Sequence, residues 1–195
     1  ALLRDAGWAV QDLQLVNAKT GAPFRFEILL VSPAFERIVL PYVRNLKRLG
    51  IEAKVRLVDE NQYINRFRQF DFDMMVWVWG QSETPGNEQY EYWSQAAADS
   101  AGSRNLAGVR DPVVDELIGL MLRSDSREQL NQRTRALDRV LSWGHYVVPH
   151  WHIRADRILH WDKFGRPETP VRTGVMTDRW WFDAERASAL DTQRQ

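Results

Sequence analysis

The stretch that most constrains the fold is an apolar run that ends at a glycine. Residues 70–80 read FDFDMMVWVWG, and the turn-forming and amide residues QSETPGN follow them at 81–87. A short apolar run bounded by turn residues favours a strand that is covered on both faces. The run therefore predicts a buried central strand that delivers polar groups to the edge of a sheet.

Side chains alternate between the two faces of a strand, so this run can be divided into two faces. Large tryptophans within such a run are usually part of the core, and we expect this of Trp77. Trp79 borders the polar loop and is the better candidate for ligand contact. One face carries Phe70, Phe72, Met74, Val76 and Val78, and the other carries Asp71, Asp73, Met75, Trp77 and Trp79.

The composition excludes several kinds of chemistry. Lys plus Arg and Asp plus Glu number 26 each, so no net charge attracts nucleic acid or an anionic membrane. The chain has no cysteine, which excludes disulfides, thiolate metal sites and cysteine nucleophiles and is compatible with an oxidising or a reducing compartment. No apolar run approaches the roughly 20 residues of a membrane span. We therefore expect no nucleic-acid partner and no membrane-spanning segment.

Hydrophobic periodicity predicts an alternating order of strands and helices before and within the apolar run. Strand-like alternation occurs twice, each time followed by a capping residue and a helical pattern. Such an order predicts parallel strands with right-handed crossovers, β-α-β-α-β. The expected elements are a strand at 24–31, a helix from Ser32 to Gly50 with a kink at Pro41, a strand at 51–57, a helix capped by Asp59, and the strand at 70–80.

Helices are expected to dominate the next part of the chain. Asp111-Pro112 is a cap and first-turn signal, and residues 126–129 resemble a capping box. We expect helices at 88–98, from 112 to Leu122, and from 127 to about Gly144, then an edge strand at 147–153. The first residues resemble the end of a helix already under way without a starting methionine, so we expect a fragment of a longer protein.

Two histidines offer the only spacing that is typical of a metal site. His150 and His152 share one face of the expected strand, but no third ligand is apparent, and we expect no metal. The sequence has no Gly-x-Ser-x-Gly elbow, no Gly-x-Gly-x-x-Gly loop and no phosphate-binding glycine-lysine motif, so we expect neither a cofactor nor an enzyme. A metal-dependent hydrolase that uses this pair stays open as an alternative.

A binding function is better supported than catalysis. Ligands of open α/β sheets bind beyond the carboxyl ends of the strands, and residues 79–87 are expected there. The loop combines aromatic surface, amide donors and acceptors, and a carboxylate for an amine, which suits a polar organic ligand. A carbohydrate-binding module that uses its tryptophans as stacking platforms is a second alternative. The candidate ligand-binding residues are Trp79, Gln81, Ser82, Glu83, Asn87 and Trp77.

Several motifs, taken in order, resemble the C-terminal lobe of the family 5 extracellular solute-binding proteins. These are receptors of ABC importers for peptides, dipeptides and nickel. The resemblance covers most of residues 1–160, and its specificity comes from the order and spacing of the motifs. They are LLRDAGW at 2–8, LKRLGI at 46–51, Phe72-Asp73 leading to Trp79, RDPVVDELI at 110–118, the helix at 126–141, and Val148-Pro149-His150-Trp151.

The resemblance implies both a fold and a function. The expected fold is α/β, a βαβαβ-based mixed sheet flanked by helices, as in the C-terminal lobe of a type II periplasmic-binding protein. Residues 1–160 would form that lobe, and residues 161–195 a tail that returns toward the N-terminal lobe, which this chain lacks. The expected function is to bind a peptide or peptide-like molecule in the periplasm and deliver it to the membrane permease of an ABC importer.

One position differs from the pattern of the oligopeptide-binding members. Residues 82–89, SETPGNEQ, are most similar to the branch for oligopeptides and microcin C-type peptides. In the oligopeptide-binding members an aspartate three residues after the counterpart of Trp79 holds the α-amino group of the ligand. Ser82 stands at that position here, and Glu83 is the neighbouring carboxylate that could replace it.

Overall fold

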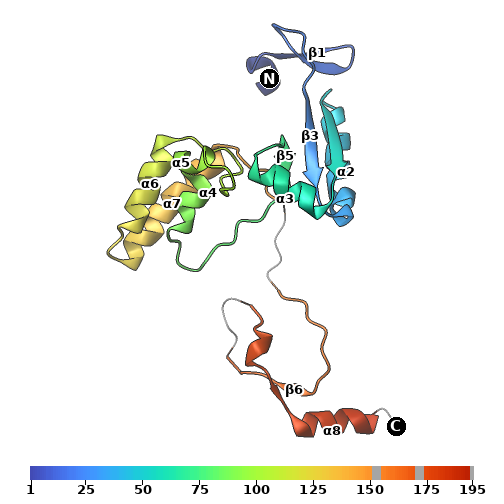
Figure 1. Ribbon diagram of the computed structural model, residues 1–195, viewed down its shortest axis with the longest axis vertical. Coiled ribbons are helices and arrows are strands. Elements are labelled where there is room, and N and C mark those ends of the chain that lie inside the picture. Colours follow the sequence, from blue (N-terminus) through green and yellow to red (C-terminus); the bar gives the residue numbers. More distant parts are fainter. Residues whose placement is uncertain (151–154, 170–173, 194–195) are drawn as a thin grey trace. The chain divides into compact units, whose positions relative to one another are not determined.

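The computed structural model describes residues 1–150, 155–169 and 174–193 (Figure 1). The chain divides into two compact units, residues 1–147 and residues 148–195, and each is described by itself below. The expected division into a lobe that ends at residue 160 and a tail stays a prediction.

A three-stranded parallel sheet with the strand order β4-β3-β5 organises the first unit. Two crossover helices connect the strands, so the predicted β-α-β-α-β order is confirmed. The elements are β3 (Arg25–Leu30), the 3-10 turn η1 (Pro33–Phe35), α2 (Glu36–Lys47), β4 (Glu52–Leu57), α3 (Glu60–Arg68) and β5 (Met74–Met75).

The capping residues expected from the sequence begin these helices. The hydroxyl oxygen of Ser32 accepts a hydrogen bond from the Ala34 amide at 3.3 Å, and a carboxylate oxygen of Asp59 accepts one from the Gln62 amide at 2.9 Å. Helix α2 continues through Pro41 to Lys47, and the expected kink there stays a prediction. Val39 of α2 packs in one buried cluster with Ile28 and Leu30 of β3 and Ala53 of β4.

The predicted central strand at 70–80 is wrong in its length and its position. Strand β5 pairs with β3 at two residues alone and forms an edge of the described sheet. Beyond it, side-chain hydroxyls bind carbonyls that a strand ladder would use: Tyr63 donates to the Val76 carbonyl and Tyr92 to the Gly80 carbonyl. Val78 is 83% exposed. The apolar residues of this run predicted a strand buried between two others. In the structure, the hydroxyls of Tyr63 and Tyr92 bind the backbone of residues 76–80 instead, and that backbone lies outside the sheet.

An antiparallel hairpin that the sequence analysis did not predict precedes the sheet. It consists of β1 (Trp8–Gln11) and β2 (Gln14–Asn17) and follows the short helix α1 (Leu2–Asp5). Its turn residues Asp12 and Leu13 have φ angles of 48° and 65°. Two-residue turns of this kind favour Asn-Gly or Asp-Gly, so Asp-Leu gave no hairpin signal.

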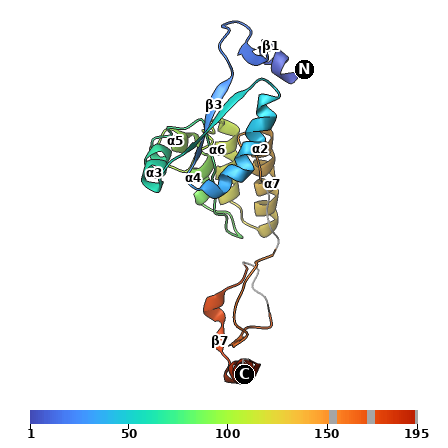
Figure 2. The ribbon, with the colours of Figure 1, turned by 90° about the vertical axis from the view of Figure 1, so that its right-hand side faces the viewer.

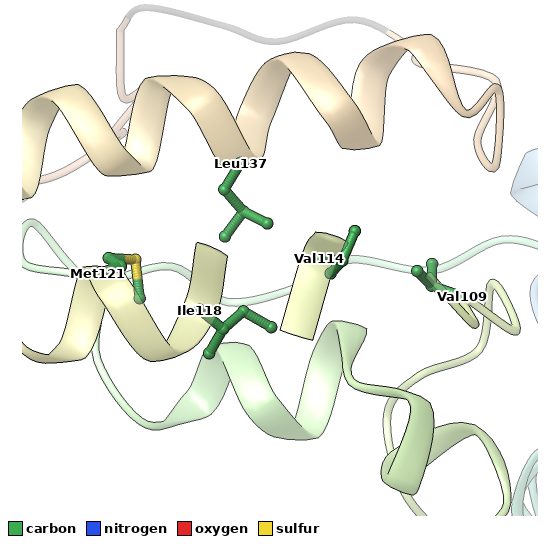
Figure 3. Close-up of a cluster of buried hydrophobic side chains, with 5 residues drawn as sticks. All are labelled: Val109, Val114, Ile118, Met121 and Leu137. Atoms are coloured by element: carbon green, nitrogen blue, oxygen red, sulfur yellow. The ribbon is translucent and has the colours of Figure 1, made fainter. Parts of the chain in front are cut away.

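Four helices make up the rest of the first unit: α4 (Glu88–Trp93), α5 (Gln95–Ala98), α6 (Pro112–Leu122) and α7 (Arg127–Trp143). The predicted helix at 88–98 is interrupted at Ser94, which adopts extended backbone angles and caps α5. The caps predicted at Asp111 and Ser126 are confirmed. Helices α6 and α7 lie side by side (Figures 1 and 2) and enclose a buried cluster (Figure 3), formed with the preceding loop by Val109, Val114, Ile118, Met121 and Leu137.

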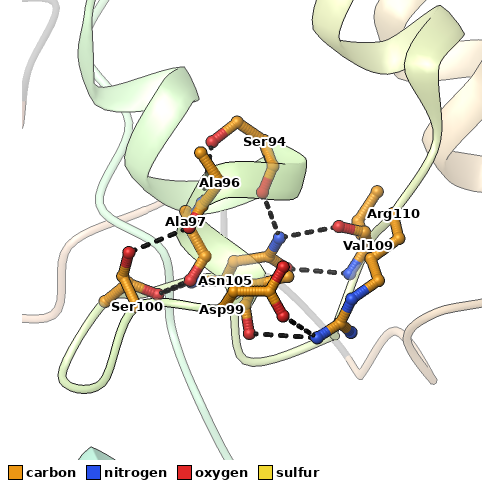
Figure 4. Close-up of polar contacts among 10 residues, drawn as sticks. Ser94, Ala96, Ala97, Asp99, Ser100, Asn105, Val109 and Arg110 are labelled. Atoms are coloured by element: carbon orange, nitrogen blue, oxygen red, sulfur yellow. Dashed lines mark hydrogen bonds and ion pairs between the residues drawn. The ribbon is translucent and has the colours of Figure 1, made fainter.

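The loop between α5 and α6 is organised around the side chain of Asn105, which is 1% exposed (Figure 4). Its amide nitrogen donates to the carbonyl oxygens of Ser94 at 2.8 Å and Val109 at 2.9 Å, and its amide oxygen accepts from the Val109 backbone N–H at 2.9 Å. An unpaired buried amide would be costly, so this complete pairing determines the path of the loop.

The second unit contains little regular structure. Strands β6 (Phe164–Gly165) and β7 (Trp181–Phe182) pair antiparallel, and η2 (Thr177–Arg179) precedes β7, which is followed by α8 (Ala184–Gln193). Of the strand expected at 147–153, residues 147–150 are not in a strand and residues 151–153 lie outside the described residues. Within the described parts of the chain, no helix has the length and apolarity needed to cross a membrane.

We predict that Gly50→Ala destabilises the first unit strongly. Gly50 has a φ of +81°, and an added Cβ would lie 2.6 Å from the Leu15 backbone nitrogen. The variant should lower the free energy of unfolding by about 3 kcal/mol, from the left-handed backbone and the clash together, as measured by urea denaturation. Gly102→Ala is the control, because Gly102 has a φ of +82° with nothing within 4 Å. It should cost about 1 kcal/mol, and equal losses would contradict the role of the close contact.

Candidate ligand-binding site

An open apolar pocket of about 330 Å³ lies at the carboxyl end of β3. This is the edge at which ligands of parallel α/β sheets are expected. The lining comes from the end of β3, the turn before α2, helix α3 and the segment after β5. The lining residues are Leu30, Val31, Ser32, Phe35, Tyr63, Val76, Trp77 and Val78.

Trp77 is half-buried and belongs to both the packing of α3 and the wall of this pocket. Its ring stacks on Phe67 with centroids 4.9 Å apart and planes 23° apart. Its buried indole N–H has no hydrogen-bond partner among the described residues. The expectation of core packing is therefore met on one side of the ring, and a ligand contact on the pocket side stays a prediction.

Tyr63 joins α3 to the irregular segment after β5. Its side chain is largely buried, and its hydroxyl donates to the Val76 carbonyl. Burial raises the pKa of Tyr63 to about 12, so the hydroxyl stays protonated and remains a donor near neutral pH.

Trp79 is held by the helical part of the first unit. Its ring centroid lies 4.8 Å from that of Trp93, and its indole N–H donates to the Arg104 carbonyl at 2.9 Å. The neighbouring carbonyl of Gly80 accepts from the Tyr92 hydroxyl at 3.0 Å. The loop after the apolar run is therefore anchored to α4 and to the loop before α6.

Hydrogen bonds from α4 and α7 hold residues 81–84 of this loop. The side-chain oxygen of Gln81 accepts a hydrogen bond from Gln89 at 2.7 Å, which ties the loop to α4. The guanidinium of Arg127, at the start of α7, donates to the Thr84 hydroxyl at 3.0 Å and to the Glu83 carbonyl at 3.1 Å. Two helices thus determine the course of residues 81–84.

The remaining candidate residues lie along the same loop. Ser82 is exposed and its hydroxyl donates to the Thr84 carbonyl, while the Glu83 side chain is exposed. Asn87 is exposed at the start of α4 and its side chain does not cap the helix. The structure brings Trp79 and Gln81 against α4 and leaves Ser82, Glu83 and Asn87 on the loop surface, and their contact with a ligand stays a prediction.

Glu88, the first residue of α4, places a carboxylate next to the end of the loop. Burial raises its pKa, but hydrogen bonds from the backbone N–H of Gly86, from its own backbone N–H and from the Gln89 side chain outweigh burial, so the net pKa is lowered. One of its oxygens accepts from the Gly86 N–H at 2.9 Å and from Gln89 at 3.2 Å. The side chain is therefore an ionised acceptor at neutral pH.

Sequence reasoning did not identify the other walls of the apolar pocket as site residues. The sequence patterns place Ser32 at the start of a helix and do not single out Phe35 or Tyr63. The signal that could have found them is their position, because the turn after β3 and the following helices meet at the carboxyl edge of the sheet.

A second, charged pocket of about 340 Å³ lies near the start of β5. Arg66 pairs with both Glu27 and Asp71 at 2.9 Å, and Arg56 also pairs with Glu27. Burial raises the pKa of Glu27, but the hydrogen bonds and charges of Arg56 and Arg66 together lower it. These charges are paired with one another, so we assign them to holding the segment before β5 against β3 and α3.

The metal site that the sequence offered as an alternative, His150 with His152, lies only partly within the described residues. His150 is described, whereas His152 lies outside the described residues, so the pair itself is not tested. Among the residues that the structure describes, no group of three or more His, Cys, Asp or Glu side chains could hold a metal ion. The tryptophans of the candidate site pack pairwise on Phe67 and Trp93 and do not form a row of stacking platforms.

Comparison with known proteins gives a consistent result. Residues 1–101, about half of the chain, match the family described as bacterial extracellular solute-binding proteins, family 5 Middle. The uncharacterized protein y4wM of Sinorhizobium fredii is 50% identical over 92% of this chain and 27% of its own length. The probable peptide-binding protein YejA of Agrobacterium fabrum is 43% identical over 92% of this chain and 30% of its own length. The chain thus spans roughly three tenths of these relatives.

The fold also has a counterpart of known structure. The oligopeptide-binding protein AppA from Bacillus subtilis, solved in complex with a nonapeptide, matches 74% of this chain and 29% of AppA, with a TM-score of 0.65 and 23% identity. A likeness at this identity concerns the fold. It confirms the predicted mixed α/β architecture with a parallel sheet flanked by helices, as in type II periplasmic-binding proteins.

The raised pKa of Tyr63 predicts a loss of stability at alkaline pH. The unfolded tyrosine, with a pKa of about 10, loses its proton before the folded one, whose pKa is about 12. The stabilisation is therefore complete below pH 10 and decreases as the pH rises from 10 to 12. Tyr63→Phe should cost about 1 kcal/mol near pH 8 through the lost hydrogen bond and should flatten the decline above pH 10. Urea denaturation across this pH range measures both effects, and equal slopes for the two proteins would contradict the assignment.

Proposed function

The chain belongs to the bacterial extracellular solute-binding proteins of family 5, and from that premise we propose that it is the ligand-binding lobe of a peptide-class receptor serving an ABC importer. The observation that carries this proposal is the polar loop 79–87, which α4 and α7 anchor and which directly follows residues 76–78 in the wall of the apolar pocket at the carboxyl end of β3. The family consists of binding proteins, so the proposed role is binding without catalysis.

The chemistry of this edge suits a peptide or a peptide-like molecule. A peptide carries apolar side chains next to amide groups and, at its start, a charged amine. The pocket around Tyr63 and Trp77 supplies apolar surface, and the loop supplies amides and a carboxylate. The name of YejA, a probable peptide-binding protein, supports the same class of ligand.

Glu83 is proposed as the partner of the ligand's amine. Ser82, which stands where oligopeptide-binding members carry an aspartate, is neutral and is bonded to the Thr84 carbonyl. Glu83 is the adjacent carboxylate, and Arg127 holds its backbone carbonyl in place. A charged amine enclosed without a carboxylate would be costly, so a neighbouring acidic side chain must take the role of the aspartate.

The proposed setting follows from the family. The receptor would work in the periplasm, close on its ligand together with an N-terminal lobe, and present the closed form to the membrane permease. Residues 161–195 would return toward that lobe. Trp181 and Phe182 in the second unit are exposed aromatic side chains, which supports a covering partner there.

We predict that the full-length receptor binds alanine peptides of two to six residues and that binding changes its tryptophan fluorescence. Trp77 and Trp79 lie at the proposed site, so closure around a ligand alters their surroundings. Titration by fluorescence, repeated by calorimetry, measures the affinity. Absence of binding across the alanine peptides and a matched panel of mixed-sequence peptides would contradict the proposal.

Glu83→Gln should weaken the binding of peptides that have a free amino terminus by about tenfold, the effect of losing one charge-assisted hydrogen bond. N-acetylated peptides lack that charge, so the wild type and the variant should bind them equally. Glu116→Gln is the matched control, because Glu116 is an exposed glutamate on α6 and is not part of the loop 79–87. Equal affinity of Glu83→Gln and the wild type for free-amine peptides would show that another group holds the amine.

A further inference from the structure

We propose that Gln81 offers only N–H donors to the ligand and therefore recognises an oxygen acceptor, either a peptide carbonyl or a terminal carboxylate. This inference rests on the proposed function and deepens it, because an amide side chain can otherwise meet either a donor or an acceptor. The orientation of the Gln81 amide follows from a chain of hydrogen bonds that begins in α4.

The first member of this series of hydrogen bonds is Trp93, whose ring packs against that of Trp79 with centroids 4.8 Å apart and planes tilted by 38°. Its indole N–H donates to the side-chain oxygen of Gln89 at 3.1 Å. An indole nitrogen is a donor and never an acceptor, so the amide oxygen of Gln89 must face Trp93. The nitrogen of the same amide must then point the other way.

Gln89 is 4% exposed, and its amide nitrogen has two acceptors. They are the side-chain oxygen of Gln81 at 2.7 Å and a carboxylate oxygen of Glu88 at 3.2 Å. An ionised carboxylate only accepts hydrogen bonds, so Glu88 fixes the amide of Gln89 from this end as Trp93 does from the other. A reversed amide would set its NH₂ group against an indole N–H and its oxygen against a carboxylate.

The orientation passes on to Gln81. Because Gln89 presents N–H groups to it, Gln81 must turn its oxygen inward, which leaves its NH₂ group on the opposite branch of the amide. The side chain is exposed, and its nitrogen has no hydrogen-bond partner among the described residues. Two N–H donors therefore stand on the outer side of the loop.

The backbone beside this donor is also held in place. Gln81 follows Gly80 directly, and the Gly80 carbonyl accepts from the Tyr92 hydroxyl at 3.0 Å. The donor thus stands on an anchored part of the loop, two residues before the proposed amine partner Glu83. A peptide carries its amine and its carbonyl oxygens on neighbouring residues, and the loop likewise carries a donor and a carboxylate two residues apart in the sequence.

The experiment separates this role from a purely structural one, in which Gln81 serves merely as the acceptor for Gln89. In Gln81→Glu, a carboxylate oxygen still accepts the hydrogen bond from Gln89, and water screens its repulsion by the Glu88 carboxylate because the side chain at position 81 is exposed. The outer donors are replaced by a charged acceptor. The fold should persist while an oxygen ligand is repelled. Gln11→Glu adds the same charge on the exposed strand β1 and is the matched control.

The probes are alanine peptides of two to six residues and their C-terminal amides, titrated into the full-length receptor. We expect Gln81→Glu to raise the Kd about tenfold or more while the melting temperature stays within about 2 °C of wild type, with Gln11→Glu unchanged. Equal weakening of acids and amides identifies a peptide carbonyl, and weakening of the acids alone identifies the carboxylate. Unchanged affinity of Gln81→Glu for every peptide that the wild type binds would overturn the proposal.

A second measurement tests the orientation without a ligand. In receptor labelled with ¹⁵N-glutamine, the side-chain amide protons of Gln89 should exchange slowly with water and those of Gln81 rapidly, with Gln81→Glu assigning the latter. Slow exchange at Gln81 with rapid exchange at Gln89 would overturn the proposal. A wild type that binds none of the peptides contradicts the proposed function instead, and the exchange rates still decide the orientation of the donor.

Discussion

The candidate site depends on the buried side chain of Asn105. Its three hydrogen bonds close the loop between α5 and α6, and the carbonyl of the preceding residue, Arg104, is the acceptor for the indole of Trp79. A buried amide tolerates little displacement, because each lost partner leaves a desolvated polar group. A constraint inside the helical part of the unit thus determines the position of Trp79 at the start of the candidate loop.

The same principle holds for the loop that follows. Buried polar groups on helices, Gln89 and Tyr92, need partners and find them in Gln81 and the Gly80 carbonyl, while Arg127 holds residues 83 and 84. A loop held in this way loses less conformational freedom on binding than a mobile one, which favours affinity. The polar network therefore links the stability of α4 and α7 to the proposed recognition of a ligand.

Local signals predicted much of the fold. The alternation in β3 and β4 and the caps at Ser32, Asp59, Asp111 and Ser126 are properties of short segments, and each is confirmed. Residues 147–150 simply do not form the expected strand, whereas the long strand at 70–80 and the unbroken helix at 88–98 are wrong for a shared reason. In both, a side chain takes over a backbone hydrogen bond, and the residue that does so at Val76 lies 13 positions away in the sequence.

The sequence by itself determined the β-α-β-α-β order, the family, and the loop 79–87 as the candidate site, since periodicity, capping and motif order depend on near neighbours. Tertiary structure alone decided the course of that loop and the direction of its side-chain groups. The direction of the Gln81 amide depends on Trp93 through Gln89, and the course of the loop depends on Arg127, which is 43 residues from Thr84. Hydrogen-bond polarity passes through contacts in space, so no pattern within the loop could have shown which of its side-chain atoms are left exposed.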